Sequence, residues 1–157
     1  MYPTFLPLAV FAMLAATAAV AAESEPRTHH KAADARQALV LTPEEAHHVR
    51  LEMRAFLSGV QKIVTGASHD DMPVVAAAAR ELGIAAAHEV PAGLRRKLPM
   101  QFKHLGHATH EGFDDLARDA ASMADANLAL KQLGQVMGHC VSCHATYRID
   151  VQAGGGH

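Results

Sequence analysis

Apolar residues recur at steps of three and four along most of the chain between residues 42 and 147. This spacing places side chains on one face of an α-helix, because a helix has about 3.6 residues per turn. Four segments show the pattern, and it predicts four amphipathic helices that each bury one face. Their apolar stripes are Val49, Met53, Phe56, Val60, Ile63 and Ala67; Val74, Val75, Ala78, Leu82 and Ala86; Phe102, Leu105, Thr109, Phe113, Leu116, Ala120 and Met123; and Leu130, Leu133, Met137, Cys140, His144 and Tyr147.

Each of these segments begins or ends at residues that favour helix ends. Thr42 is a suitable N-cap for the first helix, and Glu45 completes a capping box with it. Asp70-Asp71, Pro99 and Asp125 open the other three helices, while Val90-Pro91 ends the second and residues 92–97 form a short helical turn. The short connections predict an all-α fold, an antiparallel four-helix bundle over residues 42–150.

The two ends of the chain differ from this domain. Residues 6–20 are apolar, and the small residues Ala19-Val20-Ala21 at their end suit cleavage, which predicts a signal peptide over residues 1–21 and export to the periplasm. The first five residues carry no Lys or Arg, so an uncleaved membrane anchor is the alternative; after cleavage we expect no stable membrane insertion. Residues 22–41 are interpreted as a flexible N-terminal arm, and residues 151–157 as a disordered tail.

Composition narrows the classes of function. The 157 residues suit one domain, aromatic residues are scarce, and a formal net charge of −2 argues against a nucleic-acid partner. The sequence contains no Gly-rich phosphate loop and no nucleophile elbow, and it shows no general acid or base. We therefore do not expect an enzyme.

The run Cys140-Val141-Ser142-Cys143-His144 is the attachment signature of c-type haem. Two thiols add to the haem vinyl groups, and the following His binds iron. A thiol redox pair and half of a zinc site are the alternatives. A zinc site needs about four ligands, and the chain has only these two Cys. The motif therefore predicts one covalently attached haem c at Cys140 and Cys143, with His144 as iron ligand.

A haem motif at the C-terminal end of the fourth helix resembles the cytochrome c-prime family, and especially its low-spin, Met-ligated relatives. The resemblance covers about residues 42–149. Besides the haem motif, the matching pieces are Leu51-Glu52-Met53-Arg54, Gly59-Val60-Gln61, Val90-Pro91, Leu98-Pro99, His110-Glu111-Gly112-Phe113-Asp114 and Cys143-His144-Ala145-Thr146-Tyr147-Arg148.

The resemblance implies that Met53, from the first helix, is the sixth iron ligand. The alternative is a Met that only fills the core, and Met100, Met137, His47 and His48 are rival ligands by residue type. The resemblance also implies a role for Arg148, one turn after His144. Its guanidinium could bind a haem propionate, or it could be a solvated cation at a helix end.

Together, the predicted signal peptide, the haem motif and the resemblance indicate a periplasmic c-type cytochrome that carries single electrons between redox partner proteins. The first alternative is a five-coordinate haem protein that binds nitric oxide or carbon monoxide. The second is a metal-handling protein, since the chain has twelve His and His107 with Glu111 forms an i, i+4 pair. The resemblance also includes family members that form homodimers.

Overall fold

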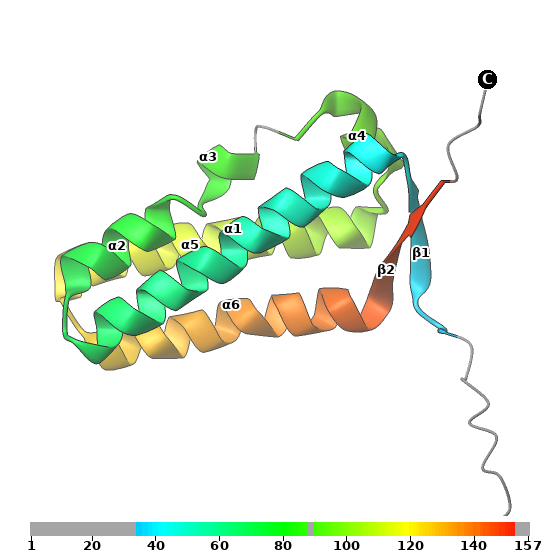
Figure 1. Cartoon of the computed structure of the whole chain (residues 1–157). Helices are drawn as coiled ribbons and strands as arrows, with labels where there is room; N and C mark the ends of the chain where they lie inside the picture. Colours follow the sequence, from blue (N-terminus) through cyan, green and yellow to red (C-terminus); the bar gives the residue numbers. More distant parts are fainter. Residues whose placement is uncertain (1–33, 88–89, 153–157) are drawn as a thin grey trace, which may run out of the picture. The chain divides into compact units, whose positions relative to one another are not determined.

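The computed structural model describes residues 34–87 and 90–152 (Figure 1). The described chain is mostly helical, as predicted. Its elements, in order, are β1 (Gln37–Leu41), α1 (Pro43–Ser68), α2 (Met72–Arg80), α3 (Ile84–Ala87), α4 (Ala92–Lys97), α5 (Met100–Met123), α6 (Ala126–Thr146) and β2 (Tyr147–Val151). The predicted signal peptide, most of the predicted arm and residues 153–157 lie outside the described residues.

The predicted helix starts are confirmed. The Thr42 hydroxyl accepts a hydrogen bond from the Glu45 backbone N–H, and the Glu45 carboxylate accepts one from the Thr42 N–H. This reciprocal pair satisfies two backbone donors that the first turn of α1 leaves without partners. Asp71 caps α2 and Asp125 caps α6 through similar bonds to backbone N–H groups.

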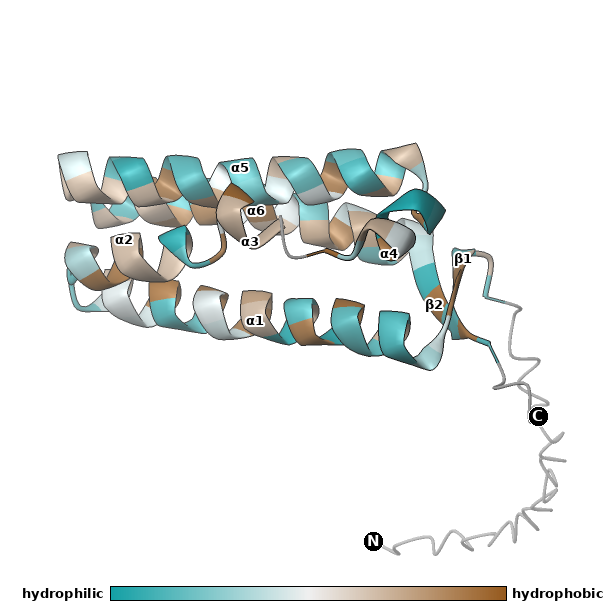
Figure 2. Cartoon of the chain, turned by 90° about the horizontal axis from the view of Figure 1, so that it is seen from above, coloured by the Kyte–Doolittle hydropathy of each residue, from teal (hydrophilic) through white to brown (hydrophobic). Residues whose placement is uncertain are grey.

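The long helices pack side by side around a shared apolar interior. α1 contacts α2 and α6, and α5 contacts the same two helices. Figure 1 shows each helix lying antiparallel to the two that it contacts. Apolar and polar residues are interspersed along α1 and α5 in Figure 2, as the three-and-four spacing requires. The largest fully buried side chains of this interior are Ile63, Val75, Phe113 and Leu116.

The second predicted helix is broken into shorter pieces. α2 ends at Arg80, and the chain turns at Gly83, where an Asp114 oxygen accepts a hydrogen bond from the Ile84 N–H at 2.9 Å. The Asp114 carboxylate occupies the space that a Cβ at residue 83 would need. α3 and α4 then continue the chain past the remaining length of α1 and α5.

Three predictions about the ends of the domain are wrong. Residues 37–41, assigned to a flexible arm, form strand β1, and Tyr147 begins strand β2 instead of continuing the fourth helix. The two strands pair in parallel, with Gln37 opposite Tyr147 and Leu41 opposite Val151. Val151 is therefore ordered in a strand, although it was assigned to the tail. β1 leads directly into α1 and β2 directly follows α6, so both strands lie at one end of the helices (Figure 1).

The apolar stripes are correct at most positions and wrong at some, including Val74 of the second stripe and His144 of the fourth, which are both exposed. Leu130, Met137 and Met123 were predicted to be buried, but they are 43%, 45% and 64% exposed. The buried side of α6 is instead made by Ala129, Leu133 and Val136. Among the described helices, none is both long enough and apolar enough to cross a membrane.

Candidate functional site

The two cysteines lie on the last two turns of α6, close to the strands. Both are free thiols and about half-buried. Burial raises the pKa of both thiols, and the neighbouring Cys140 raises that of Cys143 further. Reactive redox cysteines have lowered pKa values, because the thiolate is their nucleophile. The surroundings of Cys140 and Cys143 therefore disfavour the alternative of a thiol redox pair.

Residues of α1 and α6 line a small cavity at this end of the molecule. Met53 of α1 lines it together with Cys143 and His144 of α6. Its volume is about 60 Å³, and its other walls are Leu39, Val49, Phe102, Tyr147, Arg148 and Ile149. Met53 is half-buried and packs against the cluster of apolar residues that the strands complete. The sulfur-bearing residue predicted from α1 thus shares one cavity with the predicted imidazole of α6.

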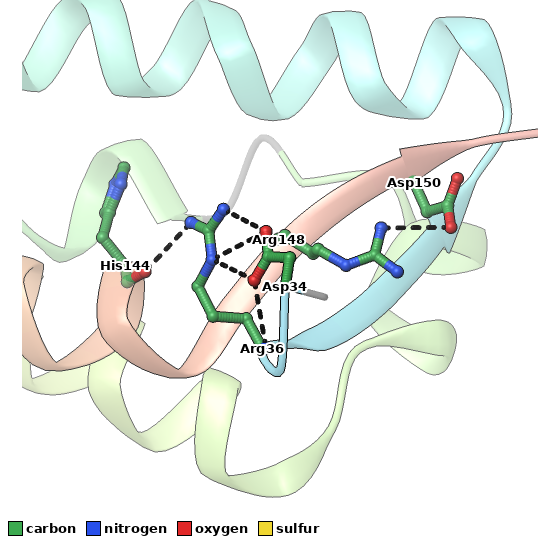
Figure 3. A network of polar contacts seen from close by, with 5 residues as sticks. All are labelled: Asp34, Arg36, His144, Arg148 and Asp150. Carbon is green, nitrogen blue, oxygen red and sulfur yellow. Dashed lines mark hydrogen bonds and ion pairs between the residues drawn. The ribbon is translucent and has the colours of Figure 1, made fainter. Parts of the chain in front are cut away.

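The residues just before β1 hold the end of α6 through polar contacts, which Figure 3 shows. Arg36 donates a hydrogen bond to the backbone carbonyl oxygen of His144 at 3.2 Å and pairs with Asp34 at 2.6 Å. The hydrogen bonds from Arg36 lower the pKa of the Asp34 carboxyl to about 2. These contacts attach the chain before β1 to the residue that follows the second cysteine.

Arg148 lies in β2 and lines the small cavity. Its Nη1 pairs with Asp150 at 3.2 Å, as Figure 3 shows. Its Nε is buried and has no hydrogen-bond partner within the described chain. A buried donor without an acceptor costs free energy, so a carboxylate from a bound group would be a favourable neighbour here.

A larger cavity of about 320 Å³ adjoins the small one, and Val49 and Phe102 line both. It is bounded by α1, α3, α4, α5 and Val90, and no residue of α6 lines it. Its apolar walls include Leu94 and Leu98 of the α4 segment, and its cationic side chains are Arg95 and Lys103. The sequence had pointed to neither cation, because neither belongs to a motif.

A buried ion pair also lines the larger cavity. His110 Nε2 lies 3.4 Å from a Glu52 carboxylate oxygen, and its Nδ1 lies 2.7 Å from the Leu82 carbonyl oxygen. Burial alone lowers the pKa of His110, but the bonds to Glu52 and Leu82 outweigh burial and raise it. The pair joins α1 to α5, and the His110 ring also packs on Phe56 with centroids 5.2 Å apart.

Of the four rival iron ligands, only His48 lines either cavity. Met100 is 61% exposed, Met137 is also exposed, and neither lines either cavity. His47 is exposed, whereas His48 lines the larger cavity. His107 and Glu111 form an exposed pair at 3.2 Å. Residues 34–87 and 90–152 contain no cluster of three or more His, Cys, Asp or Glu side chains that could hold a metal ion.

The residue types at this end of the molecule are those that a c-type haem would need, but the small cavity is too small to contain a haem. Cys143, the exposed residue His144 and the thioether of Met53 from the facing helix line the small cavity, whereas Cys140 lines neither cavity. Cavities for small organic ligands span about 300–1,000 Å³, so a haem requires space beyond the 60 Å³ beside Met53.

No family model matches the chain, and neither a curated protein nor a solved structure matches it.

Proposed function

We propose that this chain is a four-helix-bundle cytochrome that carries single electrons through one covalently bound haem c. A single observation supports the proposal most strongly: Met53 and His144, from two different helices, line the same cavity as Cys143. The haem supplies an iron that alternates between the ferric and ferrous states. The electron comes from one redox partner protein and passes to another, in the periplasm if the predicted signal peptide directs export.

The residues of the chain have separate tasks in this proposal. Cys140 and Cys143 fix the haem to α6 by thioether bonds, His144 binds iron from one side and Met53 binds it from the other. A thioether ligand and apolar walls favour the ferrous form and raise the reduction potential. Because α1 and α6 pack against each other along the helical body, they hold the two ligands rigidly during electron transfer.

The spin state of the iron tests this proposal. We expect the purified wild-type protein to be low-spin in both oxidation states and to bind carbon monoxide slowly or not at all. Met53→Ala removes the thioether, so this variant should become largely high-spin, bind carbon monoxide readily and have a lower reduction potential. Absorption spectra and redox titration measure these changes.

Two matched variants complete the experiment. Met100→Ala should leave the spectrum unchanged, because Met100 is exposed away from the cavity. His48→Ala tests the rival imidazole at the larger cavity. A high-spin wild-type protein whose spectrum does not respond to Met53→Ala would reject the electron carrier and favour the protein that binds nitric oxide or carbon monoxide.

A further inference from the structure

The larger cavity lies next to the candidate haem site and has cationic side chains in its lining. It adjoins the small cavity across Val49 and Phe102, and its polar lining includes the cations Arg95 and Lys103. The one acidic side chain of its lining, Glu52, is paired with His110. The charge that remains uncompensated in the lining is therefore positive, and it suits an anionic group.

The chemistry of haem c indicates which anion would reach this cavity. The two thioether bonds and the two carboxylates of a haem lie on opposite edges of the macrocycle. Both cysteines are on α6, so the carboxylate edge must point away from α6. The larger cavity lies on that far side, because α1, α4 and α5 line it and α6 does not.

We propose that the larger cavity receives the carboxylate edge of the haem, and that Lys103 and Arg95 bind the carboxylates. This inference rests on the proposed function and names the residues that would orient the haem within the same site. Lys103 is half-buried at the cavity, where an ammonium–carboxylate pair is stronger than on an open surface. Arg95 uses its Nη2 to hold the carbonyl oxygens of Ala87 and Val90, which leaves its other N–H groups for a carboxylate.

This assignment differs from the role that the sequence suggested for Arg148. Arg148 follows His144 by four residues and lies in β2, where its Nη1 pairs with Asp150 and its buried Nε has no partner within the described chain. A carboxylate at Arg148 would place the haem edge beside the helix that carries both thioether bonds. Phe102 and Val49 separate the two cavities, so their side chains must move apart to admit the haem.

A larger side chain in place of Gly106 would fill part of the larger cavity. It lines the cavity, and a Cβ at this position would meet no atom within 4 Å. Gly134 on α6 is equally open, but it lines neither cavity. Gly106→Leu should therefore disturb the haem, whereas Gly134→Leu makes the same chemical change on a helix surface and should not.

The experiment uses the haem-loaded full protein and compares six variants. We expect Lys103→Gln and Arg95→Gln to lower the reduction potential, since a nearby cation disfavours the extra positive charge of ferric haem, and to shift the propionate bending band in the resonance Raman spectrum. Arg148→Gln and the distant Lys131→Gln should shift both readouts less. Gly106→Leu should lower the fraction of protein that carries low-spin haem, and Gly134→Leu should match wild type.

The outcomes separate this inference from the function on which it rests. Wild-type protein without covalent haem would overturn both. Haem-loaded, low-spin protein in which Arg148→Gln shifts the Raman band while Lys103→Gln and Arg95→Gln do not would overturn only the inference. An unchanged spectrum in Gly106→Leu would also overturn it, because the haem would then not use the larger cavity.

Discussion

The buried His110–Glu52 pair is the residue-scale feature that joins the body of the protein to the candidate site. The His110 side chain is only 6% exposed, and both ring nitrogens have partners, one on α1 and one in the turn after α2. Glu52 is the neighbour of Met53 in the sequence. The pair therefore fixes the rotation of α1 at the turn that carries the predicted thioether ligand.

His110→Phe should destabilise the protein by about 1–3 kcal/mol at pH 6, because the Glu52 carboxylate and the Leu82 carbonyl both lose their partner. His107→Phe, which breaks the exposed pair with Glu111, should change stability by less than about 0.5 kcal/mol. Urea unfolding measures both. Equal effects of the two substitutions would contradict a structural role for the buried pair.

The pH dependence of the same pair follows from the direction of its pKa shift. The pKa of His110 is raised in the folded protein, so the ionic contribution is complete below the ordinary His pKa of about 6.5. It is lost as the pH rises through the folded-state pKa. The difference in stability between wild type and His110→Phe should therefore shrink toward alkaline pH.

At the scale of elements, local signals predict helices well and the strand pair poorly. Thr42, Asp71 and Asp125 mark helix starts because a capping side chain bonds to backbone N–H groups only two or three residues away. β1 and β2 pair across more than a hundred residues, and no local signal specifies that partner. The alternation of Tyr147, Ile149 and Val151 with polar residues is a period of two that could have indicated β2.

The strand β1 should contribute to stability, because it pairs with β2 and buries apolar side chains. Leu41 is 1% exposed, so Leu41→Ala should cost about 2–5 kcal/mol through lost burial and a cavity. Val40, its neighbour in the same strand, is 53% exposed, and Val40→Ala should change stability by less than about 0.5 kcal/mol. Thermal unfolding distinguishes the two. A free arm before residue 42 would make both substitutions silent.

At the scale of the whole molecule, the interior is divided between a large apolar cluster along the helices and a smaller one beside the strands. The large cluster is closely packed by Ile63, Phe113, Leu116 and their neighbours. The smaller cluster contains Met53 and Cys143 and borders both cavities. The Cys-x-x-Cys-His spacing predicted which residues of α6 take part, but it could not predict the cavities, because side chains from α1, α4, α5 and both strands form their walls.

This division leads to a prediction about the contribution of haem to stability. A group that binds only the folded protein stabilises it, and the proposed haem would contact the smaller cluster and not the larger one. Replacing both Cys140 and Cys143 by Ala should therefore prevent covalent attachment and lower the melting temperature. Because the large cluster does not border the cavities, the variant should keep most of its far-ultraviolet circular dichroism at low temperature.

Hydrogen exchange can show which parts of the protein lose stability when both cysteines are replaced. In the double variant, backbone amides of β1, β2 and the last turns of α6 should exchange faster, while amides around Phe113 and Leu116 keep their protection. The single variants Gly134→Ala and Gly138→Ala, at open positions on the same helix, should bind haem normally and serve as controls. A melting temperature that is the same with and without the two cysteines would show that no haem is built into this end of the molecule.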